Sequence, residues 1–415
     1  MDSSNLNDTG FLKIFATSSA GLFPIQNAKI EVAYTGEPNQ ILEEISTDES
    51  GNSETISLDA PPLEYSMEPS DNQPYSEYNI RVTAPGYEEQ IITGIQILSG
   101  EIGIQNVRLT PSPDNPINYN PIVIGGHTLW EYYPPKIAEA EVKPINETGE
   151  IVLRKVVVPE TIVVHDGVPS DPTATDYYVP YLDYIKNVAC SEIYSTWPTS
   201  TIEANVLAIM SFTLNRVFTE WYRNKGYNFT ITSSTAYDHK WIYGKTIYEN
   251  VSQIVDYLYN SYLARPNIKQ PILTQYCDGK RVTCPNWMSQ WGSKALGDDG
   301  FSSTDIIRYY YGSDMYVNTA EIVSGIPASY PGYDLNIGSS GDAVIQIQEQ
   351  LNRISDNFPA IPKISVDGIY GQGTANAVRK FQEIFDMPVS GIVDYPTWYK
   401  ISQIYVGVSK IAENI

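Results

Sequence analysis

The sequence predicts a multidomain α+β protein with a β-rich beginning, a mixed α and β centre and a helical end. Three observations support this fold class. The chain has 415 residues, which is more than a single hydrophobic core usually serves. Hydrophobic residues make up 42% of it and charged residues 18%, a balance typical of folded domains. The spacing of apolar residues also changes along the chain, from alternation near the start to helical periodicity near the end.

The first part, residues 8–112, reads as short strands. Apolar and polar residues alternate in runs such as 11–15, 29–32 and 78–82, and turn-forming clusters such as 48–52 separate the runs. We therefore predict a small antiparallel β-sandwich. The order of these runs resembles the prealbumin-like or carboxypeptidase-regulatory sandwich, a widespread accessory module, and the runs carry no visible chemistry.

Residues 113–158 are rich in Pro, Asn and acidic side chains, a composition that packs poorly. We interpret this stretch as a linker or a propeptide. An apolar run at 151–158 contains the basic pair Arg154-Lys155. The run is either a protease site or a first strand, and its pattern favours the strand.

Residues 159–328 mix helical and extended patterns and form the predicted catalytic domain. Helical spacing over 181–192 places Glu192 on the apolar stripe, which is unusual for a carboxylate. Pro198 and the capping-box spacing from Ser200 to Glu203 predict the start of a second helix. A further helix is predicted over 304–311.

The last part, residues 331–408, predicts a three-helix bundle. Amphipathic patterns cover 341–354 and 373–385, and a shorter helix is expected near 396–405. The stretches "VDGIYGQGT" and "VSGIVDYPTW" echo one another, which indicates an internal duplication.

Charge excludes some partners. The formal net charge is −23, and such a chain repels phosphate backbones and anionic lipid surfaces. No long apolar run suggests a membrane span, and the first residues lack the features of a secretory signal. We expect neither nucleic acid nor membrane as a partner.

The C-terminal string from "GSSGDAVIQIQEQLN" to "VSGIVDYPTW" resembles the peptidoglycan-binding domain found at the ends of many wall-lytic enzymes. Gly368 and Gly371 suit a tight turn around Asp367. Asp367 and Tyr370 are therefore candidates for binding the wall polymer. The buried residues of these helices are expected to hold the bundle together.

Two central strings resemble stage II sporulation protein D, a lytic transglycosylase of denuded glycan. In that family a glutamate ends a helix and precedes an aromatic-proline turn and a long buried helix, as Glu192 and Trp197-Pro198 do here. The stretch Met288 to Gly292 matches the family's Met-Ser-Gln-Trp-Gly motif. Cys284-Pro285-Asn286-Trp287 stands where the family usually has His-Gly-x-Gly, so this chain departs from the family pattern there.

The resemblance implies that Glu192 is the catalytic residue. A carboxylic acid in apolar surroundings stays protonated near neutral pH, and one such group can act first as acid and then as base. The alternative is a helix-end glutamate paired with a basic neighbour. Four residues are candidates for binding sugar, as opposed to simple packing: Trp197, Ser289, Gln290 and Trp291.

The chain has three cysteines and three histidines. Cys277 and Cys284 flank a Gly279 turn and are candidates for a disulfide, for a metal site with His239, or for free thiols. There is no CxxC pair, and His127, His165 and His239 lie in different segments. We therefore expect no cofactor, with zinc as the weaker alternative.

The order of the four parts resembles that of clostridial spore cortex-lytic enzymes. The resemblance implies a zymogen located at the spore cortex, outside the spore core, and a subtilisin-like Csp protease that activates it by a cut within 145–160. Cortex peptidoglycan would be its substrate. The alternatives are an N-acetylmuramoyl-L-alanine amidase and a noncatalytic peptidoglycan-binding protein.

Overall fold

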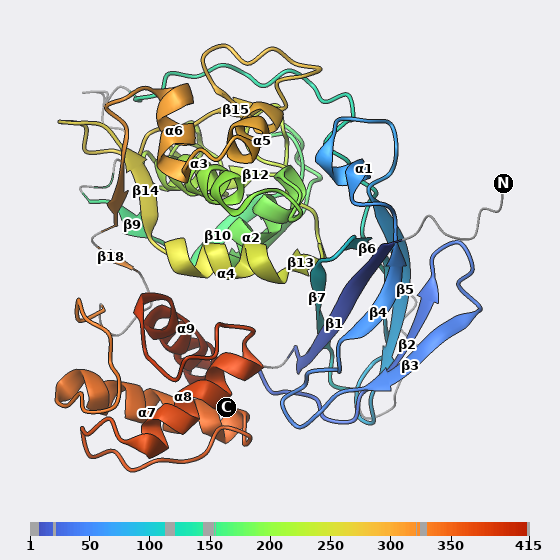
Figure 1. Ribbon diagram of the computed structural model, residues 1–415, viewed down its shortest axis with the longest axis vertical. Coiled ribbons are helices and arrows are strands. Elements are labelled where there is room, and N and C mark those ends of the chain that lie inside the picture. Colours follow the sequence, from blue (N-terminus) through green and yellow to red (C-terminus); the bar gives the residue numbers. More distant parts are fainter. Residues whose placement is uncertain are drawn as a thin grey trace. The chain divides into compact units, whose positions relative to one another are not determined.

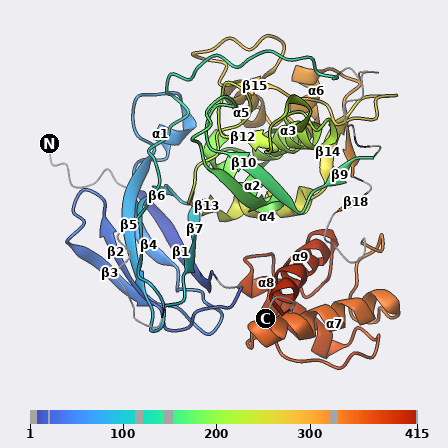
Figure 2. The ribbon, with the colours of Figure 1, turned by 180° about the vertical axis from the view of Figure 1, so that it is seen from behind.

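A computed structural model describes residues 8–19, 22–112, 121–143, 153, 155–320, 322–323 and 330–412 (Figure 1). The chain divides into two compact units. The first contains Met1–Pro61, Tyr75–Gly125 and Gly325–Ile415, and the second contains Pro62–Pro74 and Gly126–Ser324. The chain therefore passes from the first unit to the second and back two times, at residues 62–74 and at residues 126–324. The colours of Figures 1 and 2 follow this path.

The strands of the first unit pair into two groups. In one, β1 (Asp8–Ser18) pairs antiparallel with β4 (Ile56–Ala60) and parallel with β7 (Ile102–Leu109). The other is a sheet in the order β3 (Ile41–Ser46), β2 (Lys29–Tyr34), β5 (Tyr75–Thr83), β6 (Gln90–Leu98) and β8 (Ile122–Val123).

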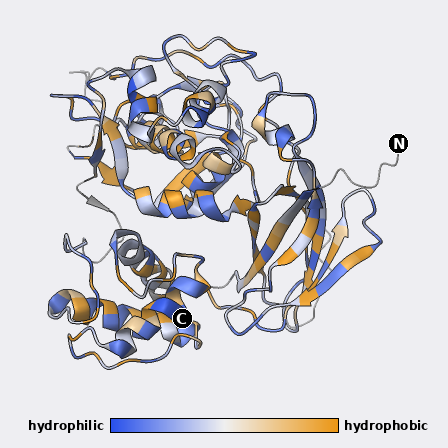
Figure 3. Cartoon of the chain, viewed as in Figure 1, coloured by the Kyte–Doolittle hydropathy of each residue, from blue (hydrophilic) through white to orange (hydrophobic). Residues whose placement is uncertain are grey.

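Alternation along these strands separates core from surface, because successive side chains point to opposite faces. Leu12 and Ile14 of β1, Ile30 of β2 and Ile92 of β6 have no exposed surface. Apolar and polar residues alternate visibly along the strands in Figure 3. The alternation that predicted strands in residues 8–112 therefore follows a real buried core.

The C-terminal part of the first unit is helical. It contains α7 (Asp342–Asn357), α8 (Gln372–Ile384) and α9 (Tyr395–Ala412). The last helix is longer than the predicted 396–405. Aromatic and aliphatic side chains from all three helices fill the core, and the fully buried ones include Val344, Leu351, Phe381 and Trp398.

The second unit is built around α3 (Thr199–Phe218), which is buried on nearly all sides: 17 of its 20 residues are inaccessible. Four helices pack on it or on one another, namely α2 (Tyr181–Glu192), α4 (Glu249–Leu258), α5 (Gln290–Asp298) and α6 (Ser303–Tyr311). A helix that is buried all round, as α3 is, is the central helix of its domain.

The predicted capping box at the start of α3 is wrong. The helix begins directly after Pro198, which occupies the N-cap position without a side-chain hydrogen bond, so Ser200 already lies in the first turn. Pro198 has an extended backbone, and proline at this position fixes the chain direction into the helix. By contrast α2 coincides with the predicted 181–192.

Short strands complete the second unit. The strand β10 (Thr161–His165) pairs antiparallel with β11 (Asp176–Pro180) and parallel with β12 (Ile231–Thr232). Three further pairs join β9 (Val157–Val158) to β18 (Ile322–Val323), β14 (Ser261–Ala264) to β17 (Tyr316–Thr319), and β15 (Tyr276–Cys277) to β16 (Met288–Ser289). The remaining elements are α1 (Glu64–Met67), η1 (Arg223–Lys225) and β13 (Ile247–Tyr248).

Part of the predicted strand or protease site at 151–158 forms β9, and residues 151, 152 and 154 lie outside the described ones.

We call residues 62–74 the insert and residues 126–143 the strap. Both belong to the second unit, although they precede its main part in the sequence. The strap lacks helix and strand, yet Leu129 and Lys143 are each only 6% exposed. These side chains are buried, although the composition of the strap is that of a linker. In the described part of the chain no helix is long and apolar enough to cross a membrane.

Candidate active site around Glu192

Glu192 is the last residue of α2 and is 8% exposed. The helix ends there because Ile193 adopts an extended backbone, and the chain then turns through Tyr194 to Pro198 before α3 begins. Glu192 is buried, as expected, but the expected solvated face of α2 is absent: 11 of the 12 residues of the helix are buried, Lys186 and Asn187 among them, so Glu192 is inside because the whole helix is.

Both carboxylate oxygens of Glu192 accept hydrogen bonds. The backbone N–H of Lys240 donates to Oε1 at 2.7 Å, and Nε2 of Gln290 donates to Oε2 at 2.9 Å. The same Nε2 also donates to the backbone oxygen of Glu192 at 2.7 Å. Three segments distant in sequence thus fix one carboxyl group in a single orientation.

Aromatic residues surround this carboxyl. Burial, and next the charge of Glu192, raise the pKa of Tyr276 well above its ordinary value. Tyr184 has a pKa raised by burial, then by the charges of Asp238 and Glu192. Its hydroxyl hydrogen-bonds with Nδ1 of His239 at 3.0 Å. Burial holds the pKa of His239 well below its usual range, so this imidazole is neutral.

The candidate sugar-stacking residues Trp197 and Trp291 lie side by side, with ring centroids 4.9 Å apart, and Tyr194 packs edge-on against both. The exposed fractions of the two indoles are only 3% and 4%. The structure therefore brings Trp197 and Trp291 together, and Gln290, which precedes Trp291, is the residue that binds Glu192; both indoles are buried.

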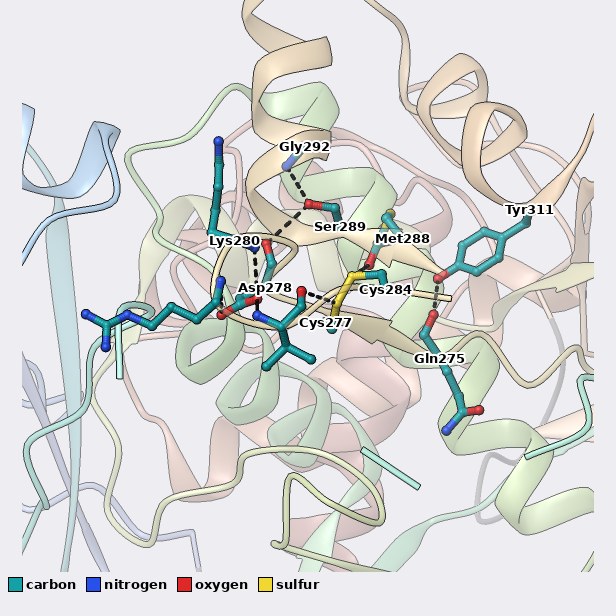
Figure 4. Close-up of a disulfide and its surroundings, with 11 residues drawn as sticks. Gln275, Cys277, Asp278, Lys280, Cys284, Met288, Ser289, Gly292 and Tyr311 are labelled. Atoms are coloured by element: carbon teal, nitrogen blue, oxygen red, sulfur yellow. Dashed lines mark hydrogen bonds between the residues drawn. A yellow bond between two sulfur atoms is a disulfide. The ribbon is translucent and has the colours of Figure 1, made fainter. Parts of the chain in front are cut away.

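Ser289 and Gln290 use their polar groups inside the domain. Ser289 is the N-cap of α5, where its Oγ accepts from Gly292 N at 2.9 Å and donates to Asp278 O at 3.2 Å (Figure 4). Gln290 follows directly and points to Glu192. Of the two, Gln290 belongs to the site, while Ser289 shapes the helix that carries it.

Cys277 and Cys284 form a disulfide that closes the hairpin shown in Figure 4. Asp278 supports this hairpin from within, because its carboxylate accepts from the backbone N–H groups of Lys280, Arg281 and Val282. Cys190 is a buried free thiol. The described residues contain no group of three or more metal-ligating side chains.

Sequence reasoning missed two parts of this site. One is the backbone N–H of Lys240, which leaves no signal in the sequence because every residue except proline carries that donor. The other is the strap, whose Lys136 lies with Nζ 4.2 Å above the ring centroid of Tyr276 and donates to Asp238 O at 2.8 Å. Burial lowers the pKa of Lys136, and the charges of Glu192 and Asp238 oppose that effect.

The predicted wall-binding residues lie in the helical part of the first unit. Asp367 accepts from Ile369 N and from Nε2 of Gln348, both at 2.9 Å. Tyr370 has no exposed surface, and its hydroxyl donates to Gly391 O at 3.0 Å. Both therefore hold the turn in this structure.

The duplication indicated by the sequence recurs in the side-chain contacts. Gln348 Oε1 accepts from the backbone N–H of Asp367 and Gly368, and its Nε2 donates to Ile369 O and Thr374 Oγ1. Gln382 repeats every contact with partners 23 positions later: Ser390 N, Gly391 N, Ile392 O and Thr397 Oγ1. Gly368 and Gly391 share φ values of 72° and 73°. Two copies of one turn are thus each held by one glutamine.

Residues 340–401 match the family described as "Putative peptidoglycan binding domain". This match supports peptidoglycan as a partner and a cell-wall or cortex location. No curated protein matches the chain.

Three solved structures show local similarity. "The crystal structure of SleB N-terminal domain" is 32% identical, covers 18% of this chain and 93% of that one, and has a TM-score of 0.16. "The Bacillus anthracis TIE protein" is 16% identical, with 25% and 17% covered and a TM-score of 0.19. The minor pilin GBS52 of Streptococcus agalactiae is 14% identical, with 28% and 50% covered and a TM-score of 0.19.

Proposed function

We propose that this chain is a peptidoglycan lytic transglycosylase whose C-terminal three-helix bundle holds the wall polymer. The observation that carries the proposal is the carboxyl of Glu192, which is nearly buried and is oriented by Lys240 N–H and by Gln290, the residue directly before Trp291, whose indole packs on that of Trp197. One oriented carboxyl beside aromatic rings suits acid catalysis on a glycan.

The proposed reaction needs only one such group. Glu192 donates its proton to the glycosidic oxygen between muramic acid and N-acetylglucosamine while the bond from that oxygen to the muramic C1 breaks. The carboxylate then takes the proton of the muramic 6-hydroxyl as its oxygen bonds to C1, which yields a 1,6-anhydro end and restores the acid. No second carboxylate and no water nucleophile are required.

The finer assignments belong to the same proposal. The two sequence motifs resemble stage II sporulation protein D, and the order of parts, with a prealbumin-like sandwich first, resembles the clostridial spore cortex-lytic enzyme SleC. On that basis we propose a zymogen that acts on cortex peptidoglycan during germination after a subtilisin-like Csp protease cuts within 145–160. Residues 145–152 and 154 of that range lie outside the described residues.

Product analysis of digested cortex tests the chemistry. Activated wild-type protein should release fragments with anhydro-muramic ends, and Glu192→Gln should lower their release by about 10³-fold or more because the proton donor is lost. Free stem peptides in place of anhydro ends would show amidase activity. Wall solubilisation by Glu192→Gln at the wild-type rate would show that this residue is not the acid.

A further inference from the structure

Two segments that precede residue 144 cover the indoles of Trp197 and Trp291. Trp197 Nε1 donates to the backbone oxygen of Ser66 in the insert at 2.9 Å. Trp291 Nε1 donates to the backbone oxygen of Leu129 in the strap at 3.4 Å. Each indole therefore gives its only hydrogen-bond donor to a covering segment, and neither donor is available to a ligand in this form.

The chemistry of these two acceptors suggests what they replace. Both are amide carbonyls, which is the group that an N-acetylated sugar presents in its acetamido substituent. An indole with its N–H at one edge and an apolar face suits a sugar that offers an amide oxygen and a C–H surface. The insert and the strap thus present the same type of acceptor to Trp197 and Trp291 that an N-acetylated glycan would present.

The strap is also fastened on both sides of Glu192. His127 Nε2 donates to Ser191 O, the backbone oxygen directly before Glu192. The N–H of Leu129 donates to the hydroxyl of Tyr194, two residues after it, at 2.9 Å. The strap therefore follows the turn that carries the proposed acid.

Beyond this turn a buried ion pair anchors the strap. The guanidinium of Arg216, which is 1% exposed, donates to both carboxylate oxygens of Glu139 at 2.6 and 2.9 Å. Arg216 also donates to Asp238 at 2.7 Å. Because Asp238 remains as a partner, release of Glu139 does not leave the buried guanidinium without a counter-charge.

Arg281 connects the insert with the strap. Its guanidinium donates to Asp71 of the insert at 3.1 Å and lies 4.3 and 4.2 Å from the ring centroids of Trp130 and Tyr132 in the strap. Arg281 lies between Cys277 and Cys284 in the sequence and so belongs to the hairpin that their disulfide closes. One side chain of the main domain thus holds both covering segments.

We infer that the insert and the strap form a two-part cover occupying the place of an N-acetylated glycan on Trp197 and Trp291, with Arg281 holding both parts. This inference rests on the proposed function of the site. A single backbone cut between residues 144 and 152 separates both parts from the domain they cover. Leu153, whose N–H bonds to Phe218 O at 3.0 Å, stays behind the cut with the rest of the domain.

The test uses the full chain with residues 145–151 replaced by the recognition sequence of a site-specific protease. Hydrogen exchange is measured over 191–197 and 288–292, and binding of an N-acetylglucosamine tetramer is followed by titration. We expect protection and no binding before the cut. After it, exchange should accelerate at least about tenfold and binding should become saturable. Unchanged protection after the cut, or equal tetramer binding before it, would overturn the inference.

Variants of the uncut chain test the connections. Arg281→Ala should speed exchange in 62–74 and 126–134 about five- to tenfold, because two cation–π contacts are lost and the pair with exposed Asp71 adds little. Lys280→Ala, its neighbour in the same hairpin, is the matched control and should leave exchange unchanged. Glu139→Gln keeps the size of the side chain that pairs with Arg216 but removes its charge. It should speed exchange in the strap more than Arg281→Ala does. Wild-type exchange in both variants would refute the cover.

These readouts remain informative if the proposed reaction fails. The cut chain could open and bind the tetramer but release no product, whether or not Glu192 is present. This result would support the proposed cover and refute the proposed transglycosylase activity. If the chain cleaves glycan equally well before and after the cut, the result would support the proposed transglycosylase activity and refute the proposed cover.

Discussion

The amide group of Gln290 holds Glu192 at two points, since Nε2 lies 2.7 Å from the backbone oxygen and 2.9 Å from Oε2 of the same residue. The backbone bond fixes the end of α2 and the side-chain bond fixes the carboxyl relative to it. Gln290 is 5% exposed, so water does not compete freely for these contacts. The second residue of the Ser-Gln-Trp motif therefore positions the proposed acid.

We predict that Gln290→Met lowers the turnover number of glycan cleavage about 10- to 100-fold, because the carboxyl loses its orientation while the volume of the side chain is kept. KM should change much less, since no sugar contact is removed. Steady-state kinetics on purified glycan strands would measure both constants. Gln372→Met, on the exposed surface of α8, is the control. An equal loss in both variants, or a change confined to KM, would contradict a positioning role.

The disulfide hairpin offers a second prediction. A closed loop of this length constrains the unfolded chain by about 2.5 kcal/mol, and removing it by Cys277→Ala with Cys284→Ala should lower the melting temperature of the second unit by about 5 °C. The turn should survive, because Asp278 still accepts three backbone hydrogen bonds. Wild-type protein under reducing conditions should melt like the double variant. A wild type that keeps its higher melting temperature after complete thiol reduction would argue against a stabilising disulfide.

Local patterns predicted the elements of this fold well. The bounds of α2 coincide with the predicted 181–192, because the helical stripe and the aromatic-proline turn after it are both local signals. Of the two signals that predicted the start of α3, Pro198 was correct and the capping-box spacing of Ser200 and Glu203 was wrong, because Pro198 occupies the N-cap and Ser200 already lies in the first turn. Spacing alone does not decide between two competing start signals.

The site was less predictable, since its geometry depends on distant contacts. Glu192 was found from one helix, but its two donors come from 48 and 98 residues further along the chain. One of them is a backbone N–H, which any residue except proline would supply at position 240. The strap escaped prediction for a different reason: its composition resembles a linker, and only pairing with Arg216 and other buried partners explains why it packs.

His127 gives the docked strap a dependence on pH. Burial, and next the charges of Lys245 and Lys240, lower the pKa of His127 to about 3. In the released strap this pKa returns to about 6.5, so between those two values the released form binds a proton that the docked form does not. The stability of the docked strap is therefore fully present above pH 6.5 and falls as the pH drops, by about 2 kcal/mol at pH 5.

Hydrogen exchange at the amide of Leu129, corrected for intrinsic rates, measures this effect between pH 7.5 and 5. Protection should fall about 30-fold over that range in the wild type, as 2 kcal/mol requires. His127→Asn keeps a donor for Ser191 O but does not titrate, and its protection should be independent of pH. Constant protection in the wild type would show that His127 does not govern release.

The duplicated turns of the bundle allow a prediction about stability, because Gln348 and Gln382 occupy equivalent places. Each side chain is fully or almost fully buried, and each satisfies two backbone N–H groups of its turn. Replacement by leucine removes the acceptor, and the N–H groups of the buried Gly368 and Gly391 are then left without a partner. Gln348→Leu and Gln382→Leu should therefore each destabilise the bundle by about 2–4 kcal/mol.

Because the two glutamines occupy equivalent places, comparing the loss of stability in the two variants is more informative than the loss in either variant alone. Hydrogen exchange of α7 and α8 in the full chain measures the loss, with Gln372→Leu on the exposed face of α8 as the control. If each glutamine does no more than hold its own copy of the turn, the two losses should agree within about 1 kcal/mol, the spread expected from context. If only one of the two variants lost stability, the other copy of the turn would have to be held by other contacts. The two copies would then share their geometry but not the interaction that stabilises it.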